Sequence, residues 1–138
     1  MNVPGVLVAA GALIMLGLGT AHLVFTFFGP KLLPRDPSLI EHMKAVSPVI
    51  TRETTIWRAW IGFNATHSYS AMLFGLVWGY LGLAWPELLF GSAFFSGLGL
   101  VTLLAYIPLG RLYFFSLPFR GILLANALYV SGLLLAHT

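Results

Sequence analysis

The sequence predicts an all-α integral membrane protein, an antiparallel four-helix bundle with a short interfacial helix in its first cytoplasmic loop. Three observations predict this fold. Of the 138 residues, 59% are hydrophobic and only 8% are charged, whereas a soluble domain carries roughly 25% charged residues. The mean hydropathy is +0.92. Four apolar segments each hold the roughly 20 residues that a helix needs to cross a bilayer.

The length allows one domain, so we expect a single transmembrane domain over residues 1–138. The first apolar segment lacks the basic region of a signal peptide and is interpreted as a retained helix. Pro86 lies in a short turn between the second and third segments, and Pro108 and Gly110 are expected to end the third. Pro118 fits the first turn of the fourth. The expected helices span residues 4–28, 56–83, 87–106 and 117–136.

The one long connection, from Gly29 to Thr55, is expected to hold a short helix over residues 37–46. Asp36 is suited to the N-cap of this helix and Pro37 to its first helical position. The apolar side chains of the helix would face the membrane surface, which predicts that the helix lies in the interface.

Charge predicts the orientation and excludes some functions. All seven Lys and Arg residues lie in or beside the long connection and the loop before the fourth helix. Such loops stay in the cytoplasm, so both termini are expected on the opposite side. The net charge of +3 therefore reflects topology and contact with membrane lipids, and no nucleic acid is expected as a partner. Because there is no cysteine, disulfides, thiol catalysis and Cys-ligated metals are excluded.

Polar residues inside the expected helices form a stripe. Trp60, Asn64 and His67 share one arc of the second helix at 100° per residue, together with small residues that allow close helix approach. His22 shares a face of the first helix with two glycines, at a similar depth of about 10 Å. Asn126 lies near the middle of the fourth. We therefore predict a polar cluster in the cytoplasmic half of the bundle, centred on His22, Asn64 and His67 with Asn126 near it.

Three interpretations of this cluster stay open. In the first, it binds an apolar or amphiphilic small molecule, such as a lipid, a quinone or an isoprenoid, and a histidine could act as acid or base. In the second, it is only hydrogen-bonded glue between helices, in an accessory or structural subunit of a larger membrane complex or in a homo-oligomer. In the third, His22 and His67 ligate haem b. The binding residues of the first interpretation are His22, Trp60, Asn64, His67 and Asn126.

No metal site and no catalytic residue are assigned. A metal ion would require a third ligand, ideally a carboxylate. The nearest carboxylate, Glu53, lies about three helical turns from Asn64 and beyond easy reach. Whether the chain is an enzyme is left open.

Three segments carry a resemblance: "GTAHLVFTFF", "ITRETTIWRAWIGFNATHS" and "AMLFGLVWGY". With these, the chain resembles a family of small, uncharacterised bacterial membrane proteins with four predicted helices. The resemblance implies a four-helix fold and a bacterial origin, so we expect the protein in a bacterial inner membrane, where the distribution of Lys and Arg places both termini in the periplasm. The chain is more loosely similar to DoxX-like and EXPERA-type proteins, which include sterol isomerases that rely on intramembrane acids. No Asp or Glu lies deep inside the expected spans of this chain.

Overall fold

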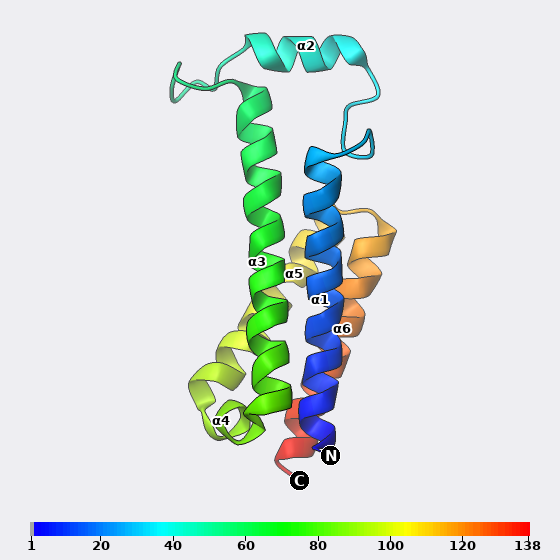
Figure 1. Cartoon of the computed structure of the whole chain (residues 1–138), viewed down its shortest axis with the longest axis vertical. Helices are drawn as coiled ribbons and strands as arrows, with labels where there is room; N and C mark the ends of the chain where they lie inside the picture. Colours follow the sequence, from blue (N-terminus) through cyan, green and yellow to red (C-terminus); the bar gives the residue numbers. More distant parts are fainter. Residues whose placement is uncertain (1) are drawn as a thin grey trace. The chain divides into compact units, whose positions relative to one another are not determined.

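All of the regular secondary structure is α-helical in the part of the chain that the structure describes. The computed structural model describes residues 2–138, which form six α-helices and no strand. The helices are α1 (Val3–Phe27), α2 (Pro37–Ala45), α3 (Ile56–Ala84), α4 (Pro86–Gly91), α5 (Ala93–Tyr113) and α6 (Ser116–Ala136) (Figure 1). The all-α prediction is therefore confirmed.

Three helices, α1, α5 and α6, are long and apolar enough to cross a membrane. The longest helix, α3, has 29 residues but is not among these three. The reason lies in the run from Asn64 to Ser70, which contains asparagine, threonine, histidine, tyrosine and two serines and lowers the hydropathy of the helix. A membrane crossing by α3, and with it the four-helix membrane bundle, stays a prediction.

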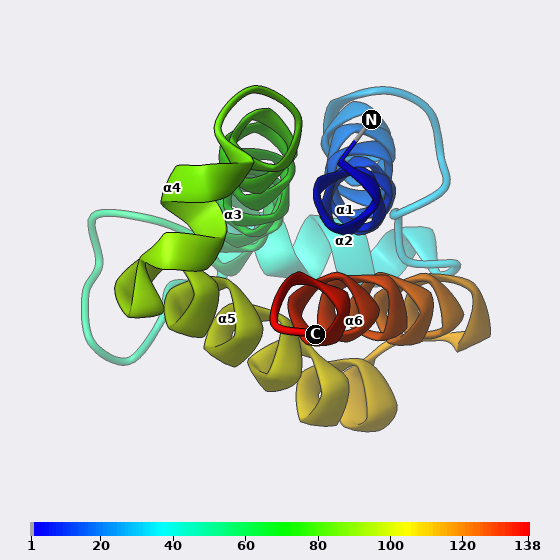
Figure 2. The ribbon, with the colours of Figure 1, turned by 90° about the horizontal axis from the view of Figure 1, so that it is seen from below.

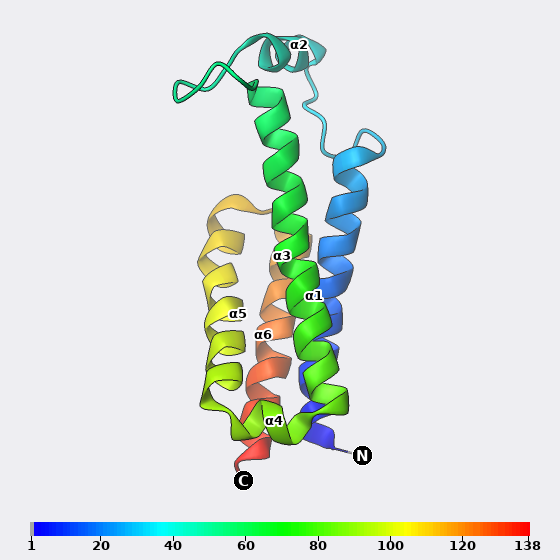
Figure 3. The same ribbon diagram turned by 60° about the vertical axis from the view of Figure 1, so that its left-hand side comes forward.

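The third predicted helix, residues 87–106, differs from the structure at both ends. The chain forms two helices here, and α4 runs across the direction of α5 (Figure 3). The break is at Ser92, whose hydroxyl accepts a hydrogen bond from the Phe95 N–H (3.4 Å) and caps α5. Pro108 and Gly110 do not end the helix as expected. Proline removes its own N–H donor and crowds the carbonyl oxygen one turn earlier, but α5 continues through Pro108 to Tyr113.

The helices are grouped into two compact units. Unit 1 comprises the described residues up to Leu18 together with Ala71–Thr138, and unit 2 comprises Gly19–Ser70. Both α1 and α3 therefore contribute to each unit. In unit 1 the first part of α1 lies beside the last part of α3 and beside α6, and α5 lies on α6 (Figure 2). Whether the whole chain is one transmembrane domain stays a prediction.

Unit 1 is packed by close backbone approach around an apolar core. Val8, Phe74, Leu103 and Tyr129 are buried in it. A Cβ atom at Gly75 of α3 would lie 2.7 Å from the Ala12 carbonyl oxygen of α1, so only glycine allows this approach. Four other glycines make comparable approaches to backbone atoms between helices of the unit, namely Gly5, Gly11, Gly82 and Gly132.

Unit 2 contains the expected short helix. Helix α2 spans Pro37–Ala45, against the predicted 37–46. The N-cap residue of α2, Asp36, accepts two hydrogen bonds from Ser38. One comes from the Ser38 hydroxyl (2.7 Å) and the other from the Ser38 N–H (2.9 Å). These bonds lower the pKa of the Asp36 carboxyl, because they stabilise its charged form. An exposed ion pair joins Lys44 to Glu41 (2.9 Å).

Candidate functional site

The candidate site lies in unit 2, where α1 and α3 are joined by a hydrogen bond between side chains. Nε2 of His22 lies 2.8 Å from Oδ1 of Asn64. Both side chains are partly exposed. The structure thus brings together two of the predicted site residues, which are 42 positions apart in the sequence.

The amide of Asn64 determines the proton position on His22. The Nδ2 of Asn64 donates to the Trp60 carbonyl oxygen (2.8 Å), one turn earlier in α3. This bond turns Oδ1 toward His22, and an amide oxygen can only accept. The Nε2 of His22 must therefore carry a hydrogen. In the neutral ring the other nitrogen, Nδ1, is then an acceptor.

The Nδ1 acceptor of His22 has no hydrogen bond to the described part of the chain. Among residues 2–138, the buried side-chain atoms that lack a partner comprise only Oδ1 of Asn126. Because Nδ1 of His22 is not among them, it is an unpaired atom that is not buried. It is open to a donor from outside the protein.

His67 completes the cluster. Its ring lies edge-on to the ring of His22, with the centroids 5.2 Å apart and the planes at 79°. The two rings are thus in direct contact within the predicted cluster, and a binding role of the pair stays a prediction. His67 lies three residues after Asn64, on the same face of α3, which is why both reach His22.

Two buried hydroxyls, not predicted from the sequence, bond to the backbone of the site residues His22 and Asn64. The hydroxyl of Thr26 donates to the carbonyl oxygen of His22 (2.7 Å), and that of Ser68 donates to the carbonyl oxygen of Asn64 (2.9 Å). Both hydroxyl residues are buried. A hydroxyl four residues after each site residue is the signal that points to these bonds, because a helical Ser or Thr reaches the carbonyl one turn back.

The side chain of Trp60 has a different setting from the three polar residues. Its ring stacks on Trp57, with centroids 5.8 Å apart and an interplanar angle of 10°. Its contribution to the cluster is its backbone carbonyl, which holds Asn64. A ligand contact of the Trp60 ring stays a prediction.

Asn126 belongs to unit 1. Its Nδ2 donates to the carbonyl oxygens of Leu103 (3.1 Å) and Ile122 (2.9 Å), both in that unit. Its Oδ1 is buried and unpaired. The bond to Leu103 joins α6 to α5, which is the hydrogen-bonded glue that polar residues supply between apolar helices. Its predicted place in the ligand site stays a prediction.

The geometry of the histidine pair does not fit haem b. Two imidazoles that ligate one haem would need room for the porphyrin between them. Here the rings are in direct edge contact, and Nε2 of His22 is already bonded to Asn64. No group of three or more His, Cys, Asp or Glu residues that could hold a metal ion occurs within residues 2–138.

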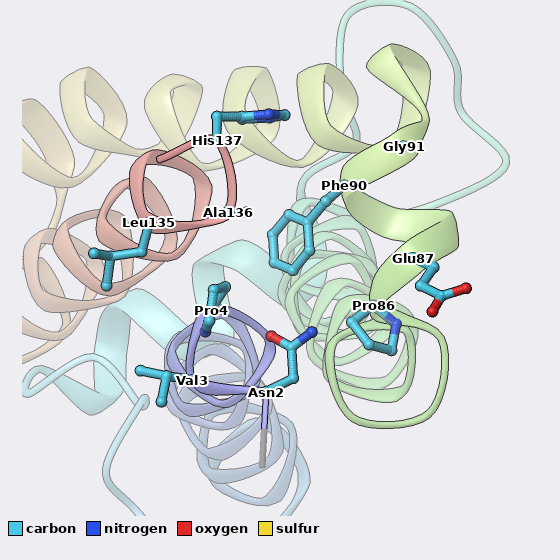
Figure 4. Close-up of a pocket in the computed structure, with 10 residues that line it drawn as sticks. All are labelled: Asn2, Val3, Pro4, Pro86, Glu87, Phe90, Gly91, Leu135, Ala136 and His137. Atoms are coloured by element: carbon cyan, nitrogen blue, oxygen red, sulfur yellow. The ribbon is translucent and has the colours of Figure 1, made fainter.

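A pocket of about 730 Å³ lies elsewhere, in unit 1, and is lined by the start of α1, by both ends of the short helix α4 and by the end of α6. Its polar side chains are Asn2, Glu87 and His137 (Figure 4). The Asn2 amide oxygen already accepts the Gly5 N–H (2.9 Å) and caps α1. None of the predicted site residues lines this pocket.

Comparisons with known proteins add no assignment to this geometry. No family model, no curated protein and no solved structure matches the chain.

Proposed function

We propose that this chain is a bacterial inner-membrane protein that binds a hydroxyl-bearing amphiphile through the His22–Asn64–His67 cluster. The single observation that carries the proposal is the pair of bonds on the Asn64 amide. One bond goes to the Trp60 carbonyl and the other comes from Nε2 of His22. Together they leave Nδ1 of His22 as an oriented, unpaired acceptor.

The chemistry of this acceptor selects the headgroup. A nitrogen lone pair accepts a hydrogen bond and does not donate one. It therefore suits a hydroxyl, as in a quinol, an isoprenoid alcohol or a lipid headgroup, better than the carbonyl of a quinone. Within the predicted range of apolar and amphiphilic ligands, this favours the ones that carry a donor.

The membrane setting supports an amphiphile as the ligand. Helices α1, α5 and α6 have the length and composition of membrane spans. At 1.5 Å per residue, the 29 residues of α3 extend about 43 Å, which exceeds the roughly 30 Å of a hydrocarbon core. We place the apolar end of α3 in the bilayer as the fourth span, and its more polar first half, with Trp57, Trp60 and Asn64, toward the cytoplasmic interface. Both termini then lie in the periplasm.

The competing candidate function is structural: the cluster would only hold helices together as hydrogen-bonded glue. The same His22–Asn64 bond favours this function, because that bond joins two helices. A bond of this kind between membrane helices contributes about 0.6 kcal/mol on average. Glue alone requires neither an accessible Nδ1 nor a fixed tautomer. These two features distinguish the candidates experimentally.

The test uses protein labelled with ¹⁵N-histidine in lipid nanodiscs. Farnesol is added as the hydroxyl-bearing probe, and farnesene as a matched probe without a hydroxyl. We expect the Nδ1 resonance of His22 to shift with farnesol and not with farnesene, and the shift to disappear in Asn64→Ala. His42, which is exposed in α2, is the internal control and should not respond.

Two results would contradict the proposal. Equal responses to farnesol and farnesene would show that the hydroxyl is not recognised. If neither probe shifts Nδ1 while Asn64→Ala lowers thermal stability, the cluster is glue. Reporter fusions at Lys44 and Thr138 test the orientation separately, and a cytoplasmic C-terminus would contradict it.

A further inference from the structure

We infer that the turn from Pro48 to Thr51 is a wedge that inserts into the headgroup region of an anionic bilayer. This inference rests on the proposed membrane location of the chain. It concerns a different surface from the histidine cluster and assigns a role to two residues, Val49 and Ile50, for which the sequence analysis gave none.

The turn presents two apolar side chains where polar residues are usual. The Thr51 N–H donates to the Pro48 carbonyl oxygen (3.2 Å), so Val49 and Ile50 occupy the two corner positions of a tight turn. Gly, Asn, Asp and Ser dominate such positions. Val49 is 110% exposed and Ile50 is 91% exposed, so neither side chain is covered by the rest of the chain. Apolar residues at these positions conflict with the usual residue types of a turn and with the usual burial of apolar side chains. Such a conflict indicates an interaction outside the protein.

The turn is held in place by the loop around it. The Ile56 N–H, at the start of α3, donates to the Val46 carbonyl oxygen (2.9 Å) and closes the base of the loop. The Thr51 hydroxyl accepts the Glu53 N–H (3.1 Å), which orders the chain after the tip. The loop extends sideways from the start of α3 (Figures 1 and 3). These two hydrogen bonds therefore hold the loop beside the first turn of α3.

The neighbouring residues favour a bilayer surface. Trp57 and Trp60, in the first turns of α3, are of the type that anchors helices at the headgroup level, and a loop extending sideways from this level lies along the interface. Unit 2 carries five Lys and Arg residues against three acids, and one of those acids, Glu41, is paired with Lys44. The positive excess complements anionic lipids.

The size of the tip argues against a protein partner. A stable protein interface buries roughly 1,600 Å² in total, and two side chains at a convex tip supply only a small part of that area. Two aliphatic side chains beside Arg52 are sufficient for shallow insertion, in which the apolar groups enter the interface and the guanidinium stays at the phosphates.

The experiment exploits the absence of cysteine from the chain. Single variants Val49→Cys and Ile50→Cys are labelled with the fluorophore NBD and reconstituted in vesicles of phosphatidylglycerol and phosphatidylcholine. We expect emission at shorter wavelength and quenching by lipids that carry a shallow spin label. Iodide in the aqueous phase should quench little. With Arg52→Gln the inserted fraction should fall about five-fold, and in vesicles of phosphatidylcholine alone it should fall by at least as much.

A third labelled variant separates this inference from the proposed function. Leu73 of α3 is 62% exposed in unit 1, and Leu73→Cys should be quenched by deep lipid labels if α3 spans the membrane. If Leu73 is in lipid but iodide quenches Val49 and Ile50, the wedge is wrong and the span stands. If the tip is shielded from both lipid labels and iodide, a protein surface covers it, and the wedge is also wrong. If iodide quenches Leu73, the proposed span fails and the wedge fails with it.

Discussion

Asn64 in unit 2 and Asn126 in unit 1 show how the two parts of the molecule use the same residue differently. Each donates from Nδ2 to the carbonyl oxygen one turn earlier in its own helix. Beyond that tether, Asn126 bonds to a second backbone carbonyl, at Leu103, and its oxygen stays buried and unpaired. Asn64 instead turns its oxygen to a titratable ring, that of His22. The Asn126 amide joins α6 to α5, and the Asn64 amide orients the imidazole of His22.

The surroundings of the two residues differ in the same way. Unit 1 is an apolar core in which glycines allow backbones to approach, and Asn126 is buried within it. In unit 2, Asn64, His22 and His67 are all partly exposed, and the exposed side chains include Val49 and Ile50 at the loop tip. Close approach of glycines and burial of apolar side chains therefore characterise the interior of unit 1, whereas the histidine cluster of unit 2 is partly exposed.

The largest expected effect tests the packing side of this comparison. Gly75→Ala should destabilise the protein by about 1–3 kcal/mol, because its Cβ would lie 2.7 Å from the Ala12 oxygen and 2.8 Å from the Leu16 nitrogen. The matched control is Gly62→Ala on the same helix in unit 2, where nothing lies within 4 Å of the added Cβ. Thermal unfolding in detergent measures both. Equal losses would remove the distinction between the units.

The next effect tests the polar side. A double-mutant cycle of His22→Ala and Asn64→Ala should give a coupling energy of about 0.6–1.7 kcal/mol, the range of hydrogen bonds between membrane helices. The cycle of His42→Ala with Asn64→Ala is the control and should be additive, because His42 is exposed in α2. A coupling near zero for His22 would mean that the bond contributes nothing to stability.

A smaller effect is expected at Asn126. Asn126→Leu removes the bond to Leu103, but it also removes the buried Oδ1 that has no partner. The two changes oppose each other, so the free energy of unfolding should change by less than about 1 kcal/mol. The same substitution at Asn64 should cost more, since it leaves Nε2 of His22 without its acceptor. If Asn126→Leu is the more damaging change, the assignment of Asn126 to simple glue is wrong.

Much of the fold could be predicted from the lengths of the apolar segments and from the capping and proline residues that start helices. Apolar run lengths are sufficient to locate α1, α3 and α6, and the Asp36–Pro37 pair is sufficient to start α2. The break at Ser92 could not be predicted in this way, because the residues on both sides of it are apolar and helix-compatible. The continuation through Pro108 was missed because an interior proline usually kinks or ends a helix, whereas long apolar helices tolerate one.

The candidate site was predictable in part for a similar reason. The 100° periodicity of a helix is sufficient to place Asn64 and His67 on one face, and depth counting brings His22 to their level. The direction of the Asn64 amide depends on the Trp60 carbonyl, which is backbone and leaves no trace in the residue type. Val49 and Ile50 were not identified because apolar residues next to a proline carry no periodic signal.

The smallest expected effect compares the caps of the two units as pH changes. The Asp36 carboxylate caps α2 in unit 2, and its hydrogen bonds with Ser38 lower its pKa. A carboxyl with a lowered folded pKa contributes stability above its ordinary value, and this contribution is lost as the pH falls through the folded pKa. Amide hydrogen exchange in residues 37–45 should therefore accelerate below about pH 4, beyond the intrinsic pH dependence of exchange. Asp36→Asn keeps an acceptor without a titrating group and should remove this acceleration.

The cap of α5 in unit 1 is the Ser92 hydroxyl, which does not titrate, so exchange at the start of α5 should show no corresponding change. Acceleration at both caps would indicate general acid unfolding and would contradict a local role for Asp36.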